Sequence, residues 1–556
     1  MKQGDFMKNR QEIIELKNYL VTEYHAQRVK DQQTDESYYK DTFQPPLLKK
    51  PALDHKTGEA ARQIDLPAEH LITNNPQAFR LARTKAEVDK AIKVGKLLNH
   101  LLKRTKMQNP NPFHLSVKTN LKRGEVYNQL VLNQNWTSQN QVGLPVWFHI
   151  PDPMIIFPSP VEYDCIPEEV IIWCKRDAAN IKKLWPEWTY KGSEKKAQWL
   201  GYYSAEQRYF EAENEVIVDE GNLLGIVPFV HVYSGYGSAS PDAKPEDLVV
   251  GRLRNMRAML DAERTLFSDA MSLVHRFCYG NIDFRRLDRD VPDNALDNYS
   301  KDAFAQNLLH WGVEPVNTAD LLKNLDYILT QLGVVRNRLD RELSPLFEGM
   351  MRGSSGRQDD MATQNALRRY ETVMDNIQTL WSISLSQALK IIDTVPDMLP
   401  ISIYTEDRKE GVRLSRETSV TKSDIAGYYD CEVELKAADV LEQDRQALMW
   451  RNAYQTLPIS ATTALVKGYG MTADEAEEEI EDRMKDDATI NFPPWRMMMG
   501  MQLAKKQGIP MDVMMQFMQH GLPAAGKGKP EEIETPRGRG RVDSGYQRGE
   551  RREAMP

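Results

Sequence analysis

The chain has 556 residues, of which 41% are hydrophobic and 27% charged, so it is long enough for several domains and apolar enough for a real core. Its net charge of -8 argues against a protein that wraps and holds DNA, but does not exclude one along which DNA slides, because a negative wall avoids tight phosphate contacts. The sequence has no apolar run of the roughly 18 residues that a membrane helix needs and no signal peptide, which predicts synthesis in the cytoplasm. Four scattered cysteines predict a reducing compartment and no disulfide framework.

The N-terminal region is predicted to be a helix followed by an exposed arm. Residues 8–30 place Ile13, Leu16, Leu20 and Tyr24 on one helical stripe. The stretch that follows is polar and ends in two prolines, which is typical of an arm on the surface.

A second helix is predicted over residues 77–106, with an apolar stripe of Leu81, Val88, Ile92, Leu98 and Leu101. Its opposite face is basic, because only Glu87 and Asp89 offset nine cations: Arg80, Arg83, Lys85, Lys90, Lys93, Lys96, Lys103, Arg104 and Lys106. A solvated helix face explains this pattern. The alternative is contact with an acidic partner or with nucleic acid.

Residues 112–235 change texture to short β-branched or aromatic runs punctuated by glycine and proline, which predicts strands. One short helix, over about 177–185, interrupts them. The mixture predicts an α+β domain.

Two long helices that flank a compact insert are predicted next, over residues 246–347. The first repeats apolar residues at steps of three, four or seven: Val249, Leu253, Met256, Leu260, Phe267, Met271 and Val274. The second has Thr318 as its N-cap and repeats leucine at heptad-like spacing as far as Leu346, which suits packing against a neighbouring helix. The insert between them holds two predicted strands, GNIDFRR and NLLHWGV.

A Gly/Ser-rich loop with the sequence EGMMRGSSGRQDD follows the second helix, and a third long helix runs from it to about residue 393. Of the strands that come next, YYDCEVELK alternates strictly, with Tyr429, Cys431, Val433 and Leu435 on one face. Helices are predicted again at 440–455, 460–467 and 472–487. A Met-rich segment and a tail that contains RGRGR close the chain, and the tail is predicted to be disordered.

Established catalytic motifs are missing, since the sequence contains no P-loop pattern, no HExxH and no GxSxG. Asp397, Glu434 and Lys436 imitate the PD…ExK arrangement of nucleases, in which two carboxylates hold Mg²⁺ and the lysine steadies the attacking water. Any amphipathic strand keeps such charges on its solvated face, and His275 with Cys278 has no second pair to complete a metal site. The sequence therefore predicts a protein that assembles and conducts rather than an enzyme, with no cofactor.

The order of helix, insert, helix, Gly/Ser loop and helix resembles the portal (head–tail connector) proteins of tailed bacteriophages. The matching stretches are PEDLVVGRLRNMRAMLDAERTLFSDAMSLVHRF, LLKNLDYILTQLGVVRNRLDRELSPLFEG and MMRGSSGRQDDMATQNALRRYETVMDNIQTLW. YYKDTF, PDPMIIFPSP, GIVPFVHVYSG and ADVLEQDRQALMWRNAYQTLPISATTALVKGYG are similar to this family as well. The resemblance runs in order from about residue 8 to 500, and it rests on the order of these segments rather than on a single motif.

The resemblance implies an α+β, portal-like fold. Its parts in this chain are an N-terminal helix and arm (1–60), an α+β wing (61–244), a first stem helix (245–277), a clip (278–317), a second stem helix (318–347), a tunnel loop (348–360), a wing helix with strands (361–438), a helical crown (439–522) and a disordered tail (523–556).

The resemblance also implies a function in the virion. The family forms a ring, usually of twelve subunits, at one capsid vertex, and double-stranded DNA is packaged and later ejected through it. The implied partners are a terminase that supplies the ATPase, a head–tail adaptor, and the major capsid and scaffolding proteins, without a membrane.

Two groups of site residues follow from the resemblance. Met350, Met351, Arg352 and Arg357 are expected in the DNA channel, whereas Arg285, Arg286 and Trp311 are expected to dock terminase and then the adaptor. Ordinary surface charge is the alternative for the channel arginines. The rival functions are another ring-forming head–tail connector component, although adaptors are generally much shorter, and the metal-dependent nuclease considered above.

Overall fold

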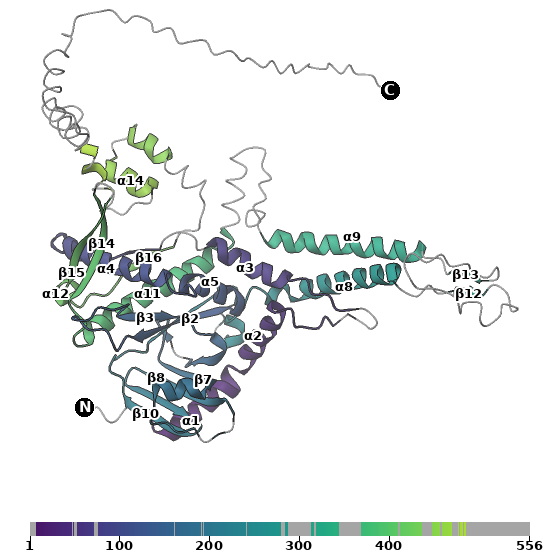
Figure 1. Ribbon diagram of the computed structural model, residues 1–556, viewed down its shortest axis with the longest axis horizontal. Coiled ribbons are helices and arrows are strands. Elements are labelled where there is room, and N and C mark those ends of the chain that lie inside the picture. The colour runs from purple at the N-terminus through teal and green to yellow at the C-terminus, as the bar shows by residue number, and fades with distance from the viewer. Residues whose placement is uncertain are drawn as a thin grey trace, which may run out of the picture. The chain divides into compact units, whose positions relative to one another are not determined.

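The computed structural model describes residues 7–46, 48, 53–71, 76–160, 162–190, 192, 194–238, 240, 242–279, 284–286, 313–315, 319–343, 368–409, 412–435, 448–455, 459–469, 476, 479–481 and 483–484. The chain divides into two compact units, Met1–Leu441 and Glu442–Pro556. Helices and antiparallel sheets are mixed in the first unit (Figure 1), as predicted for an α+β protein.

The helices of the first unit are α1 (Arg10–Asn18), a π-helix (Tyr19–Tyr24), α2 (Ala26–Tyr39), α3 (Glu59–Leu71), α4 (Val88–Lys106), α5 (Pro112–Arg123), α6 (Ala178–Leu184), α7 (Pro245–Leu248), α8 (Arg257–Tyr279), α9 (Ala319–Glu342), α11 (Glu371–Thr394) and α12 (Lys422–Ile425). Short 3₁₀ turns occupy Lys85–Glu87, Pro153–Ile155 and Arg254–Met256.

The strands are β1 (Gln77–Phe79), β2 (Glu125–Leu132), β3 (Val146–His149), β4 (Ile156–Pro158), β5 (Glu162–Tyr163), β6 (Ile166–Pro167), β7 (Glu169–Asp177), β8 (Lys196–Ser204), β9 (Gln207–Ala212), β10 (Glu215–Gly221), β11 (Phe229–Tyr233), β12 (Phe284–Arg286), β13 (Val313–Pro315), β14 (Ile401–Lys409), β15 (Val412–Val420) and β16 (Glu432–Glu434). They form sheets in the orders β10-β9-β8-β7-β4 and β11-β2-β3, together with the pairs β1-β16, β5-β6, β12-β13 and β14-β15.

The largest core forms around the sheet β11-β2-β3, against which α5 and α11 pack (Figure 1). Trp381 of α11 is fully buried, and its ring lies 4.0 Å from that of Phe113 in α5 and 5.6 Å from that of Phe148 in β3. Between β2 and α11, the Asn128 amide nitrogen donates to Ser384 Oγ at 2.9 Å, so a hydrogen bond joins two buried polar side chains inside this core.

The five-stranded sheet has an apolar core on each face. Along β7, Val170 belongs to one core and Ile171 to the other, as the period of two requires. Trp199 lies in an aromatic cluster on the first face, while the N-terminal helices cover the second face through Ile13 and Leu20. β8 and β9 were missed among the predicted strands: their sequences, KAQWLGYYS and QRYFEA, contain the aromatic residues that favour strands but none of the β-branched residues that the predicted strands share.

The helix predicted over residues 8–30 is longer than expected, and the predicted arm is partly helical. α1 passes into the π-helix, and α2 continues to Tyr39. Gln32 and Asp35 of α2 are buried because Gln32 donates to Glu125 Oε1 at 2.8 Å and Asp35 accepts from Arg257 at 2.9 Å. A pattern built on apolar residues misses a helical face whose buried residues are polar.

Residues 77–87, predicted as the start of a helix, instead form β1 and a 3₁₀ turn, so that α4 begins at Val88. The Asn99 side chain holds β1 along α4, since its Nδ2 donates to Ala78 O at 2.9 Å and its Oδ1 accepts from Ala78 N at 2.8 Å. Of the predicted apolar stripe, Leu98 and Leu101 are buried, whereas Leu81, Val88 and Ile92 are exposed.

α5 lies where strands were expected to begin. Asn111 caps it by accepting from Phe113 N at 3.0 Å, Pro112 stands in its first turn, and Gly124 follows it with a left-handed φ of 82°. These are standard start and stop signals for a helix, and the buried Phe113, Val117 and Leu121 repeat at a helical spacing of four residues, so both signals predict α5.

The first long helix begins at Arg257 rather than near residue 245. The chain before it runs against the end of α5, where Arg252 N donates to Leu121 O at 2.8 Å. A Cβ on Gly251 would lie 2.5 Å from Lys122 O, and a Cβ on Gly124 would lie 2.5 Å from the Val250 carbonyl carbon. This close approach of two backbones requires both glycines and interrupts the helical hydrogen bonding.

The predicted apolar face of YYDCEVELK is confirmed, since Val433 and Leu435 are buried and the Tyr429 hydroxyl donates to Asp393 at 2.7 Å. Only the three residues of β16 pair, because β1 is equally short. In the second unit, residues 448–455 are helical within the predicted helix 440–455, and α14 (Ala461–Tyr469) extends two residues beyond the predicted helix 460–467. Within the described part of the chain, no helix is long and apolar enough to cross a membrane.

Candidate functional site

The helices α8 and α9 form a hairpin in which they lie side by side and lead to β12 and β13 at the same end (Figure 1). β12 and β13 pair antiparallel, with Phe284 opposite Pro315 and Arg286 opposite Val313. Leu260 on α8 and Leu332 and Leu339 on α9 are buried along the hairpin. The predicted arrangement of two long helices around an insert is therefore confirmed. β12 lies within the predicted strand GNIDFRR, whereas β13 shares only Val313 with the predicted strand NLLHWGV, whose other residues lie outside the described part of the chain.

An ion pair joins the two helices of the hairpin. Arg336 of α9 donates from Nε and Nη2 to Glu263 Oε1 of α8, at 3.0 and 2.9 Å. The Glu263 side chain is only 2% exposed, and the Arg336 guanidinium also lies over the Phe267 ring at 5.1 Å from its centre. A buried carboxylate that meets a guanidinium at this position fixes how the helices lie against each other.

A short N-terminal segment, which we call the strap (residues 53–58), lies along α8. Arg264 of α8 is 1% exposed and makes a bidentate contact with Asp54 at 2.7 and 2.6 Å. Its Nη1 also donates to Asp41 at 3.2 Å. The strap's own backbone adds two hydrogen bonds, from Leu53 N to Ser272 Oγ and from His55 N to Ser268 Oγ, both at 2.9 Å.

The base of α8 is tied to α2 by further ion pairs. Arg254 donates to Asp31 at 2.6 Å, and Arg257 donates to Asp35 at 2.9 Å. Burial raises the pKa of Asp35 to about 6 even though the Arg257 charge opposes this shift. The cations that precede and begin the hairpin thus meet acids spaced four residues apart on one face of α2.

The base of α9 is tied to α3. Arg62 donates to Glu59 at 2.9 Å within α3 and to Asp340 of α9 at 3.1 Å. Gln63, which is fully buried, donates to Leu339 O at 3.1 Å. Both helices of the hairpin are therefore fixed to the body of the first unit through polar contacts at one end.

Apolar side chains remain exposed along the hairpin. Tyr327 is 66% exposed and Leu329 50%, and Val334, Met271 and Val274 are exposed to between 37% and 46%. Tyr327 and Val334 are seven residues apart and therefore share one face of α9. Apolar side chains that gather on one exposed face are typical of a surface that meets another molecule.

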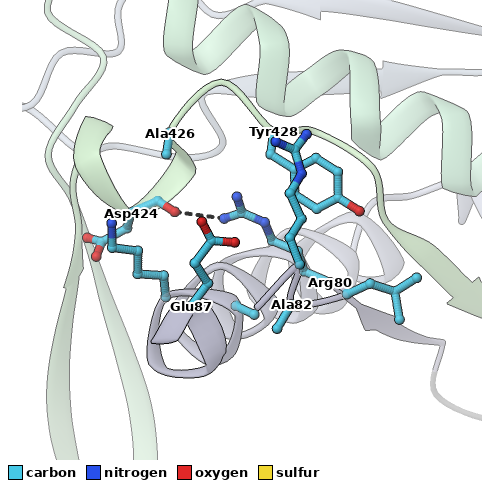
Figure 2. A pocket seen from close by; sticks show the side chains of 10 residues that line it. Arg80, Ala82, Glu87, Asp424, Ala426 and Tyr428 are labelled. Carbon is cyan, nitrogen blue, oxygen red and sulfur yellow. Dashed lines mark hydrogen bonds between the residues drawn. The ribbon is translucent and has the colours of Figure 1, made fainter. Parts of the chain in front are cut away.

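A small recess lies between the residues before α4 and the turn after α12 (Figure 2). Arg80 fixes this junction by donating to the backbone carbonyls of Asp424 and Ile425 at 2.8 and 2.6 Å. The Arg83 guanidinium stacks on the Tyr428 ring at 3.8 Å from its centre. Part of the predicted basic face is therefore structural. Arg80 and Lys93, the latter 3.5 Å from Asp424, contact α12, and Arg83 contacts the turn that follows it.

The residues predicted for a site lie mostly outside the described part of the chain. This applies to Met350, Met351, Arg352 and Arg357 of the expected channel and to Trp311 of the expected docking surface. Arg285 and Arg286 are placed by their backbone on β12, opposite Glu314 and Val313.

The nuclease-like residues do not share one element. Asp397 is exposed in the turn between α11 and β14, with a left-handed φ of 62°, whereas Glu434 ends β16. Lys436 lies outside the described residues.

The sequence analysis did not predict the polar contacts at the base of the hairpin. Asp31 and Asp35 stand four residues apart, as do Arg264 and Ser268, but their partners are more than 200 residues away in the sequence. Spacing along one segment carries no information on a partner at that separation.

Comparisons with known proteins give matches among solved structures alone. No family model matches the chain, and no curated protein matches it either. A chain from the neck of an empty gene transfer agent particle, computed with C6 symmetry, is 11% identical at a TM-score of 0.39, over 80% of this chain and 94% of that chain.

Two further matches come from the same kind of particle. A chain of the native gene transfer agent virion is 11% identical at a TM-score of 0.39, over 79% of this chain and 93% of its own length. A chain of the native neck, computed with C12 symmetry, is 10% identical at a TM-score of 0.36, over 78% and 92%. Because TM-scores below 0.5 do not establish a common fold, the proposal below rests on this chain's own residues.

Proposed function

We propose that this chain is one subunit of a ring-shaped portal at a capsid vertex, through which double-stranded DNA is packaged and ejected, and that it catalyses no reaction itself. The observation that carries the proposal is the α8–α9 hairpin. Ion pairs with one buried partner each, Arg264–Asp54 and Arg336–Glu263, hold the hairpin in place. It leads to the two-stranded β12–β13 pair and exposes apolar side chains along its length. Such a hairpin is suited to packing against further copies of itself in a closed ring.

The proposed path of DNA follows the chain order. In this proposal the segment after α9, residues 348–360, lines the channel, and Met350, Met351, Arg352 and Arg357 contact the duplex. Arginines there would meet phosphates transiently and without reading bases. The net charge of -8 supports passage rather than retention, because phosphate contacts summed over many cations make binding tight.

The proposed docking surface is the end of the hairpin. Terminase, and later a head–tail adaptor, would meet Arg285, Arg286 and Trp311. The antiparallel pairing of β12 with β13 supports this role, because it brings two separate segments to the same end of α8 and α9. Their first residues, Phe284 and Val313, are 29 positions apart in the sequence. A terminase would also supply the ATPase that packaging requires.

A packaging assay tests the proposal. In cells that produce the particle but lack this chain, we expect the wild-type gene to restore DNA-filled particles. Arg352→Ala with Arg357→Ala is expected to lower the DNA content while particles still assemble. Lys182→Ala with Lys183→Ala removes the same charge from α6 and serves as the control. Normal packaging by the arginine variant contradicts the channel assignment, and DNA-filled particles without the chain contradict the function.

A further inference from the structure

The recess beside α4 has features of a binding site that the proposed portal function does not use. Its lining comes from residues 80–83, from the first turns of α4, and from α12 and the turn after it, and it opens to solvent (Figure 2). Arg80 is hydrogen-bonded to α12 in this view and also lies 5.3 Å from the Tyr428 ring centre. The recess is therefore held in shape from both sides by contacts within the chain.

Arg83 is presented in a way that suits an anion. Its guanidinium is stacked on the Tyr428 ring at 3.8 Å, and its side chain is exposed. Stacking uses the face of a guanidinium and leaves the N–H donors around its edge available for bidentate contact. Among the described residues, no carboxylate pairs with Arg83 or with Lys90, the second cation that lines the recess. Both cations line the recess without an acidic partner from the described chain.

The surroundings indicate which kind of anion fits. Leu81 lines the same recess and is 61% exposed, and Val88 and Ile92, on the adjoining surface of α4, are both 43% exposed. Glu87 also lines the recess. Its negative charge repels the densely charged backbone of DNA more strongly than it repels a single carboxylate. A ligand with a single carboxylate and an apolar side chain beside it therefore suits both the exposed apolar residues and the low net positive charge of the lining.

The charge of this region supports the same kind of partner. Residues 80–106 carry nine lysines and arginines and two acids, in a chain whose net charge is -8. A local excess of positive charge raises the encounter rate with negatively charged partners. The apolar neighbours add contact area that long-range attraction alone does not provide.

We propose that this recess binds an acidic, apolar-containing segment of a partner protein, with a carboxylate received by Arg83 and an apolar side chain packed on Leu81, while Lys90 adds positive charge to the lining. The exposed Val88 and Ile92 extend the contact along α4. This surface is distinct from the hairpin, so it adds a second attachment point to the protein whatever passes through the assembly.

Fluorescence polarisation with labelled peptides tests the site on the full-length protein. The probes are a peptide of alternating glutamate and leucine, its glutamine–leucine counterpart, and a DNA duplex of the same net charge. The glutamate–leucine peptide is expected to bind best. Arg83→Ala should weaken its binding about five- to tenfold, and Arg83→Lys should weaken it nearly as much because the stacked fork is lost while the charge remains.

Lys103→Ala is the matched control, since it removes one exposed charge from the same helix, about 20 Å from Lys90. Leu81→Ser, which keeps every charge, should also weaken binding, whereas Lys103→Ala should change it by less than about twofold. Equal losses for Arg83→Ala and Lys103→Ala would overturn the proposal, because they would indicate general attraction to a basic helix. Tighter binding of the DNA, or equal binding of the glutamine–leucine peptide, would overturn it as well.

Discussion

Arg336 on α9 donates twice to one carboxylate oxygen of Glu263 on α8, while the second oxygen, Glu263 Oε2, is buried without a hydrogen-bond partner in the described structure. Removing the guanidinium leaves a buried carboxylate with no cation. We therefore expect Arg336→Ala to lower the stability of the hairpin by about 1–3 kcal/mol. Replacing both residues by leucine should recover most of this loss, because two apolar side chains need no partner.

Thermal unfolding combined with hydrogen exchange of the α8 amides measures this effect. Arg338→Ala is the control, since Arg338 is an exposed arginine of the same helix. If Arg338→Ala and Arg336→Ala lower the unfolding temperature equally, the ion pair does not hold the helices together.

Arg264 is expected to hold the strap against α8 through its bidentate contact with Asp54. Arg264→Lys keeps the charge but cannot reproduce both hydrogen bonds and the contact with Asp41 in one geometry. We expect the amides of Leu53 and His55, which donate to serine hydroxyls of α8, to exchange at least about tenfold faster in this variant.

Ser268→Ala separates the strap's own hydrogen bond from the ion pairs. This variant removes the acceptor of the His55 amide alone, so the protection of Leu53 should remain. Unchanged exchange at both amides in Arg264→Lys would show that the strap is held by other contacts.

His25 is expected to make stability fall as the solution becomes acidic. It is buried, its Nε2 lies 2.9 Å from Pro158 O, and burial lowers its pKa to about 3, with Arg28 adding to the shift. The unfolded chain takes up a proton as the pH falls below about 6.5, whereas the folded chain does so only near 3. Stability is therefore present above about pH 6.5 and is lost progressively as the pH falls towards 3.

The variant His25→Gln isolates this effect, because glutamine can still donate to Pro158 O but does not titrate. Between pH 6.5 and 4.5 the wild type should lose up to about 1.4 kcal/mol per pH unit more than the variant in denaturant titrations. Burial raises the pKa of Glu125, but Arg28 and His231 lower it further, so that its net pKa is about 2. Glu125 therefore makes stability sensitive to acid only below its ordinary pKa near 4.5. Parallel curves for the two proteins above pH 4.5 would contradict the assignment to His25.

The junction before α8 depends on Gly251. A Cβ at this position would lie 2.5 Å from the Lys122 carbonyl oxygen, so Gly251→Ala should cost about 1–3 kcal/mol by forcing the two backbones apart. Gly333→Ala in α9 is the matched control, since no atom lies within 4 Å of its added Cβ. The control should stabilise the protein by about 0.5–1 kcal/mol through helix propensity. Equal effects of the two substitutions on the unfolding temperature would refute the close contact.

Periodicity predicted the long elements well, because apolar residues decide which face of an extended helix is buried. Leu260, Leu332 and Leu339 are buried in the hairpin as their spacing indicates. The predicted start of α8 was wrong. Residues 249–253 continue the helical spacing of apolar residues, but Gly251 lies against α5 and these residues are not part of the helix. The contact that delays the start of the helix is made with Lys122, more than 120 residues away in the sequence.

The candidate sites were harder to predict because they are built from long-range polar contacts. Asp54 and Arg264 are 210 positions apart, and Arg83 meets Tyr428 across an even longer separation. The basic face of residues 77–106 was recognised from composition, but only the structure separates Arg80, which fixes the turn after α12, from Lys90, which lines the recess. Charge counts alone do not distinguish these two roles.

Electron microscopy of the purified protein, with mass measurement of the assembled particles, tests the ring most directly. The wild type is expected to form closed rings with a central hole wide enough for a DNA duplex. Tyr327→Asp with Val334→Asp, which places two charges on one exposed face of α9, is expected to give folded protein that does not close rings. Wild-type protein that stays monomeric under conditions where it is folded, or rings that form equally well with both aspartates, would contradict the proposed assembly.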